Sequence, residues 1–245
     1  MTLFGTLLKI EGKLVWKGLD ILIFGILFPI VLATLFGYLL SKEAAADGAS
    51  LFEMSYPAVI TIGVLATGVM GVPLTIADYR HRGILRRFQV TPVSPLHLLS
   101  AQVLIQLTSA LVSFLGVTAV YVIVFDYRMA GSWGLFLAAY ALVVCAMYAI
   151  GIFIGSVVPH QKSANLWSSV VYFTLLLFSG TTIPYEIMPR FARILMDVLP
   201  LSHGIHLMKR LSIGESAEPS IFGMAVLIFC VAAGIGGALK YFKWT

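Results

Sequence analysis

Six long apolar stretches dominate this chain and constrain its fold more than any other feature. The hydrocarbon core of a bilayer is about 30 Å thick, and a helix crosses it with roughly 20 apolar residues. Stretches of about this length lie near residues 19–40, 56–77, 98–125, 133–158, 164–183 and 220–241. Only 11 % of the 245 residues are charged, which is too few to cover a water-soluble fold or to bind nucleic acid. The sequence therefore predicts an all-α membrane protein, with one transmembrane domain over residues 1–245 and six spans.

The residues before the first stretch form an amphipathic pattern. On a helical wheel, Lys9, Lys13 and Lys17 fall on one side, and leucine, isoleucine and phenylalanine residues fall on the other. This pattern predicts an interfacial helix over residues 1–18 that lies flat on the membrane. Glu11 falls in the middle of the apolar side. Its carboxylate either reaches the lipid headgroups or pairs with a basic segment nearby.

The distribution of lysine and arginine predicts the orientation. With the N-terminus inside, the short outer loops contain only Lys42 and Arg128 as cations. Most of the remaining cations lie on the inner side, and the others share the long outer loop at residues 184–219 with acidic residues. Cytoplasmic loops are enriched in lysine and arginine, so both termini are expected in the cytoplasm.

The spans lack the groups that ion coupling needs. Transporters driven by protons or sodium place ionisable side chains within the membrane, and the middle of each predicted span has none. The chain also lacks a phosphate-binding loop, a metal-binding cluster and a hydrolase motif. We therefore expect no catalytic residue, no metal site and no cofactor in this chain. Gln102 and Gln106 share one helix face, where they either bond to a neighbouring helix or line a substrate path.

The segment between the second and third stretches is strongly basic. Its arginines surround an apolar group at helical spacing, with Arg80, Arg82, Arg86 and Arg87 around Ile84, Leu85 and Phe88. Thr91-Pro92 ends the pattern, because proline stops a helix. The pattern predicts a short amphipathic helix over residues 79–91 on the cytoplasmic face. Such a helix either anchors on anionic lipid or docks a cytoplasmic protein, and the compact apolar group favours docking.

These residues resemble the cytoplasmic signature of type-2 ABC exporter permeases, the integral-membrane subunits of drug or polysaccharide exporters. The matching segments are Arg82-Gly83-Ile84-Leu85, Val90-Thr91-Pro92-Val93-Ser94, Phe178-Ser179-Gly180, Ile183-Pro184, Met188-Pro189 and Leu199-Pro200-Leu201-Ser202. The six stretches, the N-terminal amphipathic helix and the long last outer loop agree with the same family. The resemblance thus extends over essentially the whole chain. It departs at residues 80–82, where many relatives carry acidic residues and this chain has Arg-His-Arg.

The resemblance implies a partner that supplies the energy. In this family the permease pairs with a second permease copy, identical or paralogous, and with two cytoplasmic ATPase subunits that bind ATP and Mg. The implied protein is a subunit of an ATP-driven exporter in a bacterial or archaeal cell membrane, surrounded by lipid. Glu11 is a candidate partner for one of the coupling arginines. The residues that the resemblance assigns to ATPase coupling are Tyr79, Arg80, Arg82, Gly83, Ile84, Leu85, Arg86, Arg87 and Phe88.

The resemblance also implies a substrate path along the second and fifth spans, and an outer gate after the fifth. The path residues are Thr61, Thr67, Met70, Phe178, Ser179, Thr181 and Thr182. The gate is expected as a short helix that dips back into the outer leaflet, with a simple surface helix as the alternative. The gate residues are Pro184, Ile187, Pro189, Phe191 and Ile194. A path without charge suits a hydrophobic or amphipathic substrate, such as a drug, an antibiotic, a lipid or a lipid-linked glycan.

Three other interpretations compete with an exporter subunit. A secondary transporter would need an intramembrane acid or an inverted repeat, and neither is clear here. A membrane-embedded enzyme would need a polar cluster at one depth, and His203 with His206 is too small a group. A scaffold or sensor that does not transport has no distinguishing motif. An ATPase that co-purifies with the chain would favour the exporter over all three.

Overall fold

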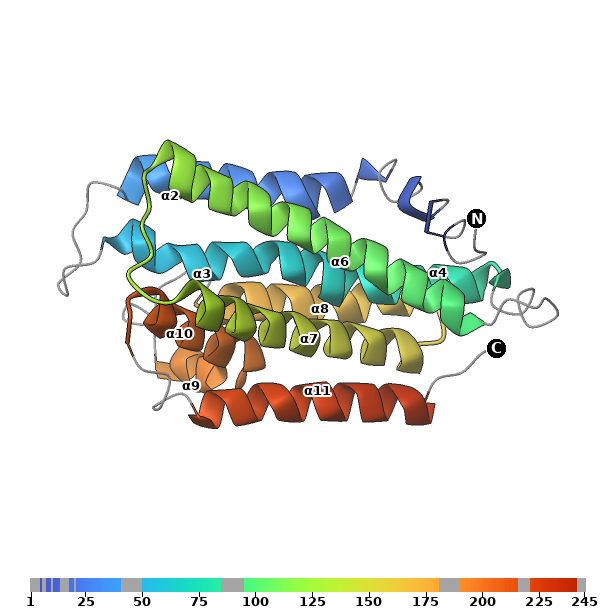
Figure 1. Cartoon of the computed structure of the whole chain (residues 1–245). Coiled ribbons are helices and arrows are strands. Elements are labelled where there is room, and N and C mark those ends of the chain that lie inside the picture. Colours follow the sequence, from blue (N-terminus) through green and yellow to red (C-terminus); the bar gives the residue numbers. More distant parts are fainter. Residues whose placement is uncertain are drawn as a thin grey trace.

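A computed structural model describes the chain at residues 5, 8–9, 11–13, 18–19, 21–40, 50–84, 95–180, 190–215 and 221–241 (Figure 1). Nearly all of these residues are helical. Segments of π-helix (η) begin the first span, lie within the second and end the third. In chain order the elements are η1 (Ile21–Leu27), α2 (Phe28–Leu40), α3 (Leu51–Val64), η2 (Leu65–Gly71), α4 (Val72–His81), α6 (Pro95–Ala119), η3 (Val120–Val124), α7 (Trp133–Val157), α8 (Gln161–Phe178), α9 (Arg190–Val198), α10 (Pro200–Ser212) and α11 (Ile221–Tyr241).

Five helices among the described residues are long and apolar enough to cross a membrane. They are Ile21–Leu40, Leu51–His81, Leu99–Val124, Trp133–Val157 and Ile221–Tyr241. They match five of the six predicted spans and confirm the all-helical class. The predicted span at 164–183 is not confirmed. Its counterpart α8 has 18 residues, and the polar side chains of Gln161, Lys162 and Asn165 in its N-terminal part make it less apolar than the other five.

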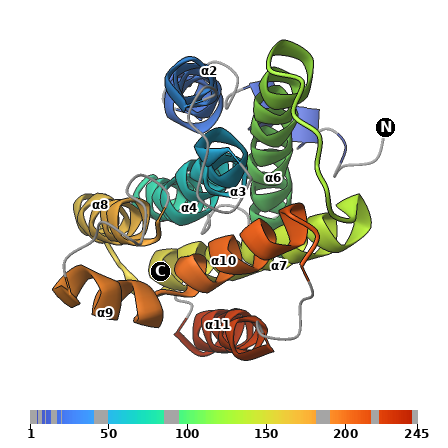
Figure 2. The ribbon, with the colours of Figure 1, turned by 90° about the vertical axis from the view of Figure 1, so that its left-hand side faces the viewer.

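The second span is the centre of the bundle. In its most apolar stretch 78 % of the residues are buried, against 22 % in the first and last spans. Viewed from one end, α3 and α4 lie between α2, α6, α7 and α8 (Figure 2). The packing agrees, because α3 contacts α2 and α6 while α4 contacts α7 and α8. Any movement of this helix must therefore be passed to most of the bundle.

Local sequence explains where the second span begins and where it changes. Ser50 and Glu53 form a capping box, in which each side chain accepts a hydrogen bond from the other residue's backbone N–H. Pro73 has no backbone N–H and cannot donate to the carbonyl of Val69 one turn earlier. The regular α-helical pattern is replaced by η2 in the turns just before this proline.

The bundle has two distinct ends. The described residues before Ile21, the end of α4 and the end of α11 share one end, which we name the terminal end (Figure 1). The opposite end carries α9, α10 and the segment 125–132 between η3 and α7, and we name it the distal end.

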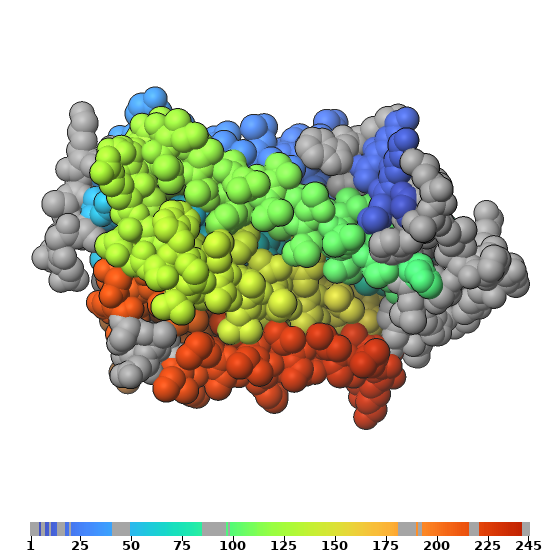
Figure 3. Space-filling view, in the orientation of Figure 1, coloured from blue at the N-terminus to red at the C-terminus, as the bar shows by residue number. Residues whose placement is uncertain are grey.

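The side of the bundle is apolar. In the space-filling view, α6 runs across the molecule above α7 and α11 (Figure 3). The exposed side chains of α6 include Leu104, Leu107, Leu111 and Leu115. A continuous apolar face of this kind is suited to lipid rather than to water.

Candidate functional site

The end of α4 forms a turn where a continuous helix was expected. The helix stops at His81, and Gly83 has φ +67°, in the left-handed region that favours glycine. Tyr79 and Arg80 therefore belong to the second span, and a turn separates them from Ile84. The helix expected over 79–91 differs at this point, because apolar spacing does not reveal a glycine with positive φ. Four of the expected coupling residues lie outside the described residues: Leu85, Arg86, Arg87 and Phe88.

Glu11 is connected to this same turn of the second span. The hydroxyl of Tyr79 donates a hydrogen bond to the Glu11 carboxylate, and both side chains are buried. The sequence suggested an arginine as the partner of Glu11, whereas the structure places Tyr79 there. A buried carboxylate is stabilised when a donor is supplied to it. The contact therefore ties the N-terminal segment to the end of the second span.

Arg80 ties α4 to α7. Its guanidinium Nη1 donates to the carbonyl of Gly155 at 3.1 Å and to that of Val158 at 2.6 Å. The last carbonyls of a helix lack backbone partners and carry the negative end of the helix dipole. The Arg80 side chain reaches the end of α7 from α4, where it donates hydrogen bonds to these carbonyls and places a positive charge at the negative end of the dipole. Arg82 instead bonds to Asp78 at 2.9 Å and remains mostly exposed.

An open cavity lies beside these residues at the terminal end. It has a volume of about 530 Å³ and lies between α4 and α8. Asp78, on its wall, accepts hydrogen bonds from Arg82 and, at 3.4 Å, from the Gln161 amide. The lining residues are Leu74, Thr75, Asp78, Gln161, Lys162 and Asn165. We name this space the polar cavity.

A second cavity continues inward from the polar one. Its volume is about 370 Å³, and it lies between η1 and α2, the second span, and α8. Leu74 and Asn165 line both cavities, so the two adjoin. The other lining residues are Ile21, Phe24, Phe28, Ala66, Met70, Gly71, Tyr172, Phe173 and Leu176. We name this space the apolar cavity.

One of the expected path residues, Met70, lines the apolar cavity. Thr61 and Thr67 are fully buried, and their hydroxyls donate to carbonyls of their own helix. Phe178 and Ser179 follow at the far end of α8, where the Phe178 carbonyl accepts from Ser202 at 3.4 Å. Thr181 and Thr182 lie outside the described residues.

Four aromatic residues of the apolar cavity were not expected from the sequence. Phe24 and Phe28 come from the first span, and Tyr172 and Phe173 come from α8. A signal was present, because Phe24 and Phe28 are four residues apart and share one helix face. The path was expected along the second and fifth spans, so no residue of the first span was assigned to it.

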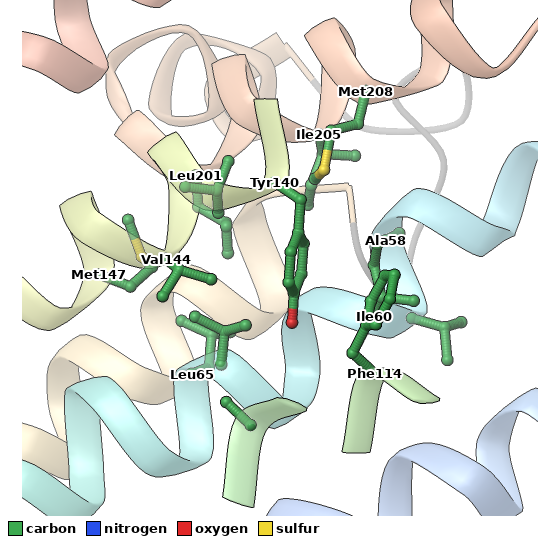
Figure 4. Close-up of a cluster of buried hydrophobic side chains, with 14 of the residues drawn as sticks. Ala58, Ile60, Leu65, Phe114, Tyr140, Val144, Met147, Leu201, Ile205 and Met208 are labelled. Atoms are coloured by element: carbon green, nitrogen blue, oxygen red, sulfur yellow. The ribbon is translucent and has the colours of Figure 1, made fainter. Parts of the chain in front are cut away.

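The described part of the region expected to form the gate contains two short helices at the distal end, α9 and α10. Pro184, Ile187 and Pro189 lie outside the described residues, as does the side chain of Phe191. Ile194 lies on α9 and is 59 % exposed. The buried helix of this region is α10, which packs against α7, α11 and α3. Its apolar side chains Leu201, Ile205 and Met208 lie beside Tyr140 and Val144 of α7 (Figure 4).

The segment 125–132 holds the end of α10. The backbone N–H of Gly131 donates to the carbonyl of Ser212 at 3.1 Å, and the Tyr127 side chain is hydrogen-bonded to Ser212. Burial raises the pKa of Tyr127 to about 12, so its hydroxyl stays protonated near neutral pH. A Cβ on Gly131 would fall 1.8 Å from the carbonyl oxygen of Leu211. Only glycine permits this approach of the two backbones.

The two glutamines of α6 are buried against the second span. The amide of Gln102 donates to the Thr75 hydroxyl at 3.3 Å, as expected for a contact between helices. Gln106 is fully buried, and neither of its amide atoms has a hydrogen-bond partner among the described residues. Neither glutamine lines the polar or the apolar cavity.

The chain is similar to known membrane transport proteins. The family model described as ABC-2 type transporter matches residues 2–211. The chain is 24 % identical over 213 residues to the daunorubicin resistance ABC transporter permease protein DrrB1 of Streptomyces coeruleorubidus, covering 86 % of this chain and 73 % of that protein.

A second relative matches a smaller part of this chain. The chain is 28 % identical over 129 residues to the inner membrane transport permease YhhJ of Escherichia coli (strain K12), covering 52 % of this chain and 34 % of YhhJ. The match therefore spans about a third of that relative's length. Because the family model covers most of the residues and the described helices are those of a multi-pass membrane protein, the chain belongs to the ABC-2 type transporter family.

Proposed function

We propose that this chain is the membrane-spanning permease subunit of an ATP-driven exporter that moves a hydrophobic or amphipathic substrate out of the cytoplasm or the inner leaflet. The observation that carries the proposal is the pair of adjoining cavities, which share Leu74 and Asn165 and extend from the terminal end along the second span and α8. The terminal end is the cytoplasmic one, with both chain termini, and α8 serves as the fifth of six spans.

The composition of the cavities favours an amphipathic substrate. Asp78 and Lys162 line the polar cavity, where a polar head keeps contact with water. Phe24, Phe28 and Tyr172 line the apolar cavity, where a ring system or an acyl chain is removed from water. Binding sites for small molecules combine an apolar interior with a few polar groups in this way.

A second permease copy, identical or paralogous, would complete the path. Phe24 of the first span and Phe173 of α8 line the apolar cavity and are exposed. Large exposed aromatic side chains next to a binding cavity favour a protein contact over lipid. Two copies facing each other through these helices would enclose the cavity on the side that is open in one chain.

The ATPase subunit would dock on the turn at Arg82, Gly83 and Ile84 and bind the ATP and Mg²⁺ itself. Two contacts can pass its movement into the bundle, namely Tyr79 with Glu11 and Arg80 with the end of α7. At the distal end α10 would form the gate, since it is buried among spans rather than lying on the surface.

Transport by inside-out vesicles tests the proposal. The chain is co-expressed with the ATPase subunit that co-purifies with it, and ATP-dependent uptake of daunorubicin is measured as the first test compound. Met70→Trp fills the apolar cavity and should reduce uptake about tenfold while the protein inserts normally. The matched control is Leu111→Trp on the exposed face of α6, which should transport like wild type. Failure to recover any ATPase partner, or equal uptake by both variants, would contradict the proposal.

A further inference from the structure

The second span carries an unusual segment at the level of the apolar cavity. Residues 65–71 form the π-helix η2 within an otherwise α-helical span. π-Helical turns are rare and occur often at functional sites. Ala66, Met70 and Gly71 of this segment line the apolar cavity. The irregular turns are therefore the part of the span that the substrate path would meet.

A relay of hydrogen bonds from α7 fixes the first limit of η2, at the carbonyl of Gly63. The Tyr148 hydroxyl donates to the Thr67 hydroxyl at 3.0 Å. Thr67 donates in turn to the carbonyl of Gly63 at 2.8 Å. A neighbouring helix thereby holds a backbone carbonyl just before the segment.

A relay from α6 fixes the second limit in the same way. The Gln102 amide donates to the Thr75 hydroxyl at 3.3 Å, and Thr75 donates to the carbonyl of Gly71 at 2.9 Å. Gly71 is the last residue of η2. The two relays thus hold a carbonyl just before the irregular turns and the carbonyl of their last residue, each through a threonine.

The Gln106 side chain lies against this part of the span, and its amide makes no hydrogen bond to the described residues. A Cβ on Gly71 would lie 2.7 Å from the Gln106 Nε2 atom, so the amide is directly against the segment. Gln106 is fully buried, and both its amide atoms lack a partner among the described residues. Leaving a buried amide unsatisfied is costly. A second arrangement of η2 that offers it a partner would account for the residue.

The ends of the span restrict what such a second arrangement can be. The capping box at Ser50 holds one end, and the contacts of Tyr79 and Arg80 hold the other. The helix therefore cannot turn as one rigid rod. An extra residue in a helix can move along it, however, and each residue that it passes is rotated by about 100° and displaced by about 1.5 Å.

We propose that η2 is a migrating joint of the second span. During the transport cycle its irregular turns shift along the helix between the held carbonyl of Gly63 and Thr75. The shift exchanges the residues that face the apolar cavity, while both ends of the span stay in place. When the turns shift, some backbone carbonyls of η2 lose their partners within the helix, and the Gln106 amide donates hydrogen bonds to them. The inference rests on the proposed function, because the cycle that the joint serves is ATP-driven transport.

Cross-linking within the complex tests the movement. In a background with Cys145→Ala and Cys230→Ala, one variant carries Met70→Cys with Asn165→Cys, both lining the apolar cavity. The yield with a short dithiol cross-linker should change several-fold between the nucleotide-free complex and the complex held with Mg-ATP and vanadate.

The control pair for this experiment is Asp78→Cys with Gln161→Cys. It joins the same two helices, but Asp78 lies beyond the Thr75 limit, so its cross-linking yield should be the same in both states. An unchanged yield for Met70 and Asn165 in a complex that transports would overturn the joint alone. A wild-type complex without ATP-dependent transport would overturn the proposed function and the joint with it.

A substitution separates the role of Gln106 from simple packing. Gln106→Leu removes the unsatisfied amide and should keep or raise the melting temperature. Because the second arrangement loses its hydrogen bonds, transport should fall on the order of five- to tenfold. Ser109→Ala is the control, since Ser109 is buried on the same helix and bonds to the carbonyl of Ile105. Transport by Gln106→Leu at the wild-type rate would contradict the proposal.

Discussion

Glu11 and Tyr79 show how a single pair of residues can connect two parts of the molecule. A carboxylate in an apolar setting needs a donor, and the Tyr79 hydroxyl supplies it. The position of Glu11 on the apolar side of its helix left two alternatives open, contact with lipid headgroups or pairing with a basic segment. The identity of the partner could not be predicted, because it depends on the second span continuing to His81 and turning only at Gly83.

Tyr79→Phe tests this contact. It leaves the Glu11 carboxylate buried without its donor and should cost about 1–3 kcal/mol of stability, measured by thermal unfolding in detergent. It should also raise the ATPase activity that is not coupled to transport. Glu11→Gln is the milder control, because the amide oxygen still accepts from Tyr79. A Tyr79→Phe protein as stable and as well coupled as wild type would show that the contact is dispensable.

The path residues show that the sequence does not predict which side of a central helix faces a cavity. Thr61 and Thr67 were expected on the substrate path because the family resemblance implies a path along the second span. In the structure both hydroxyls are buried and donate to carbonyls of the second span, because a buried threonine can donate to a carbonyl one turn back. Which side of a central helix faces a cavity depends on its neighbours, and composition does not contain that information.

At the scale of elements, the length of an apolar stretch was a sufficient signal for five spans. The thickness of the bilayer sets that length, so no tertiary information is needed. The segments η2 and α10 were not predictable in the same way. Nothing in the composition of residues 65–71 specifies a π-helix, and the periodicity of α10 indicates an apolar face without showing that other helices cover it.

The attachment of α10 can be tested at Gly131. A Cβ there would collide with the backbone of Leu211 at 1.8 Å, and backbone cannot move aside as a flexible side chain does. Gly131→Ala should therefore lower stability by about 1–3 kcal/mol and release α10 at the distal end. The measurement is thermal unfolding, together with ATP-independent leakage of daunorubicin from loaded vesicles.

Gly134→Ala provides the matched control for this change. The nearest atom to its added Cβ is 3.8 Å away, and alanine favours the helix α7. The Gly134→Ala protein should be as stable as wild type, and its vesicles should leak daunorubicin no faster. Equal behaviour of the two alanine variants would show that the contact between segment 125–132 and α10 does not hold the distal end closed.

At the scale of the whole molecule, two kinds of apolar surface are distinguishable. The face of α6 is aliphatic, with leucines along its length, whereas the surface beside the apolar cavity carries exposed Phe24 and Phe173. The first is suited to lipid tails. The second borders a cavity that is open in one chain, so a facing copy would both cover the aromatic rings and close the path.

Cysteine cross-linking in membranes distinguishes these two faces. In the background with Cys145→Ala and Cys230→Ala, Phe173→Cys should form a disulfide between two permease chains under mild oxidation. Leu111→Cys on α6 is the control and should stay monomeric, because lipid covers it. A product of twice the chain mass indicates an identical copy, and a product with a different permease indicates a paralogous one. Cross-linking at Leu111 that equals or exceeds that at Phe173 would mean that the cavity does not face a second copy, since contact between chains would then lie on the opposite side of the bundle.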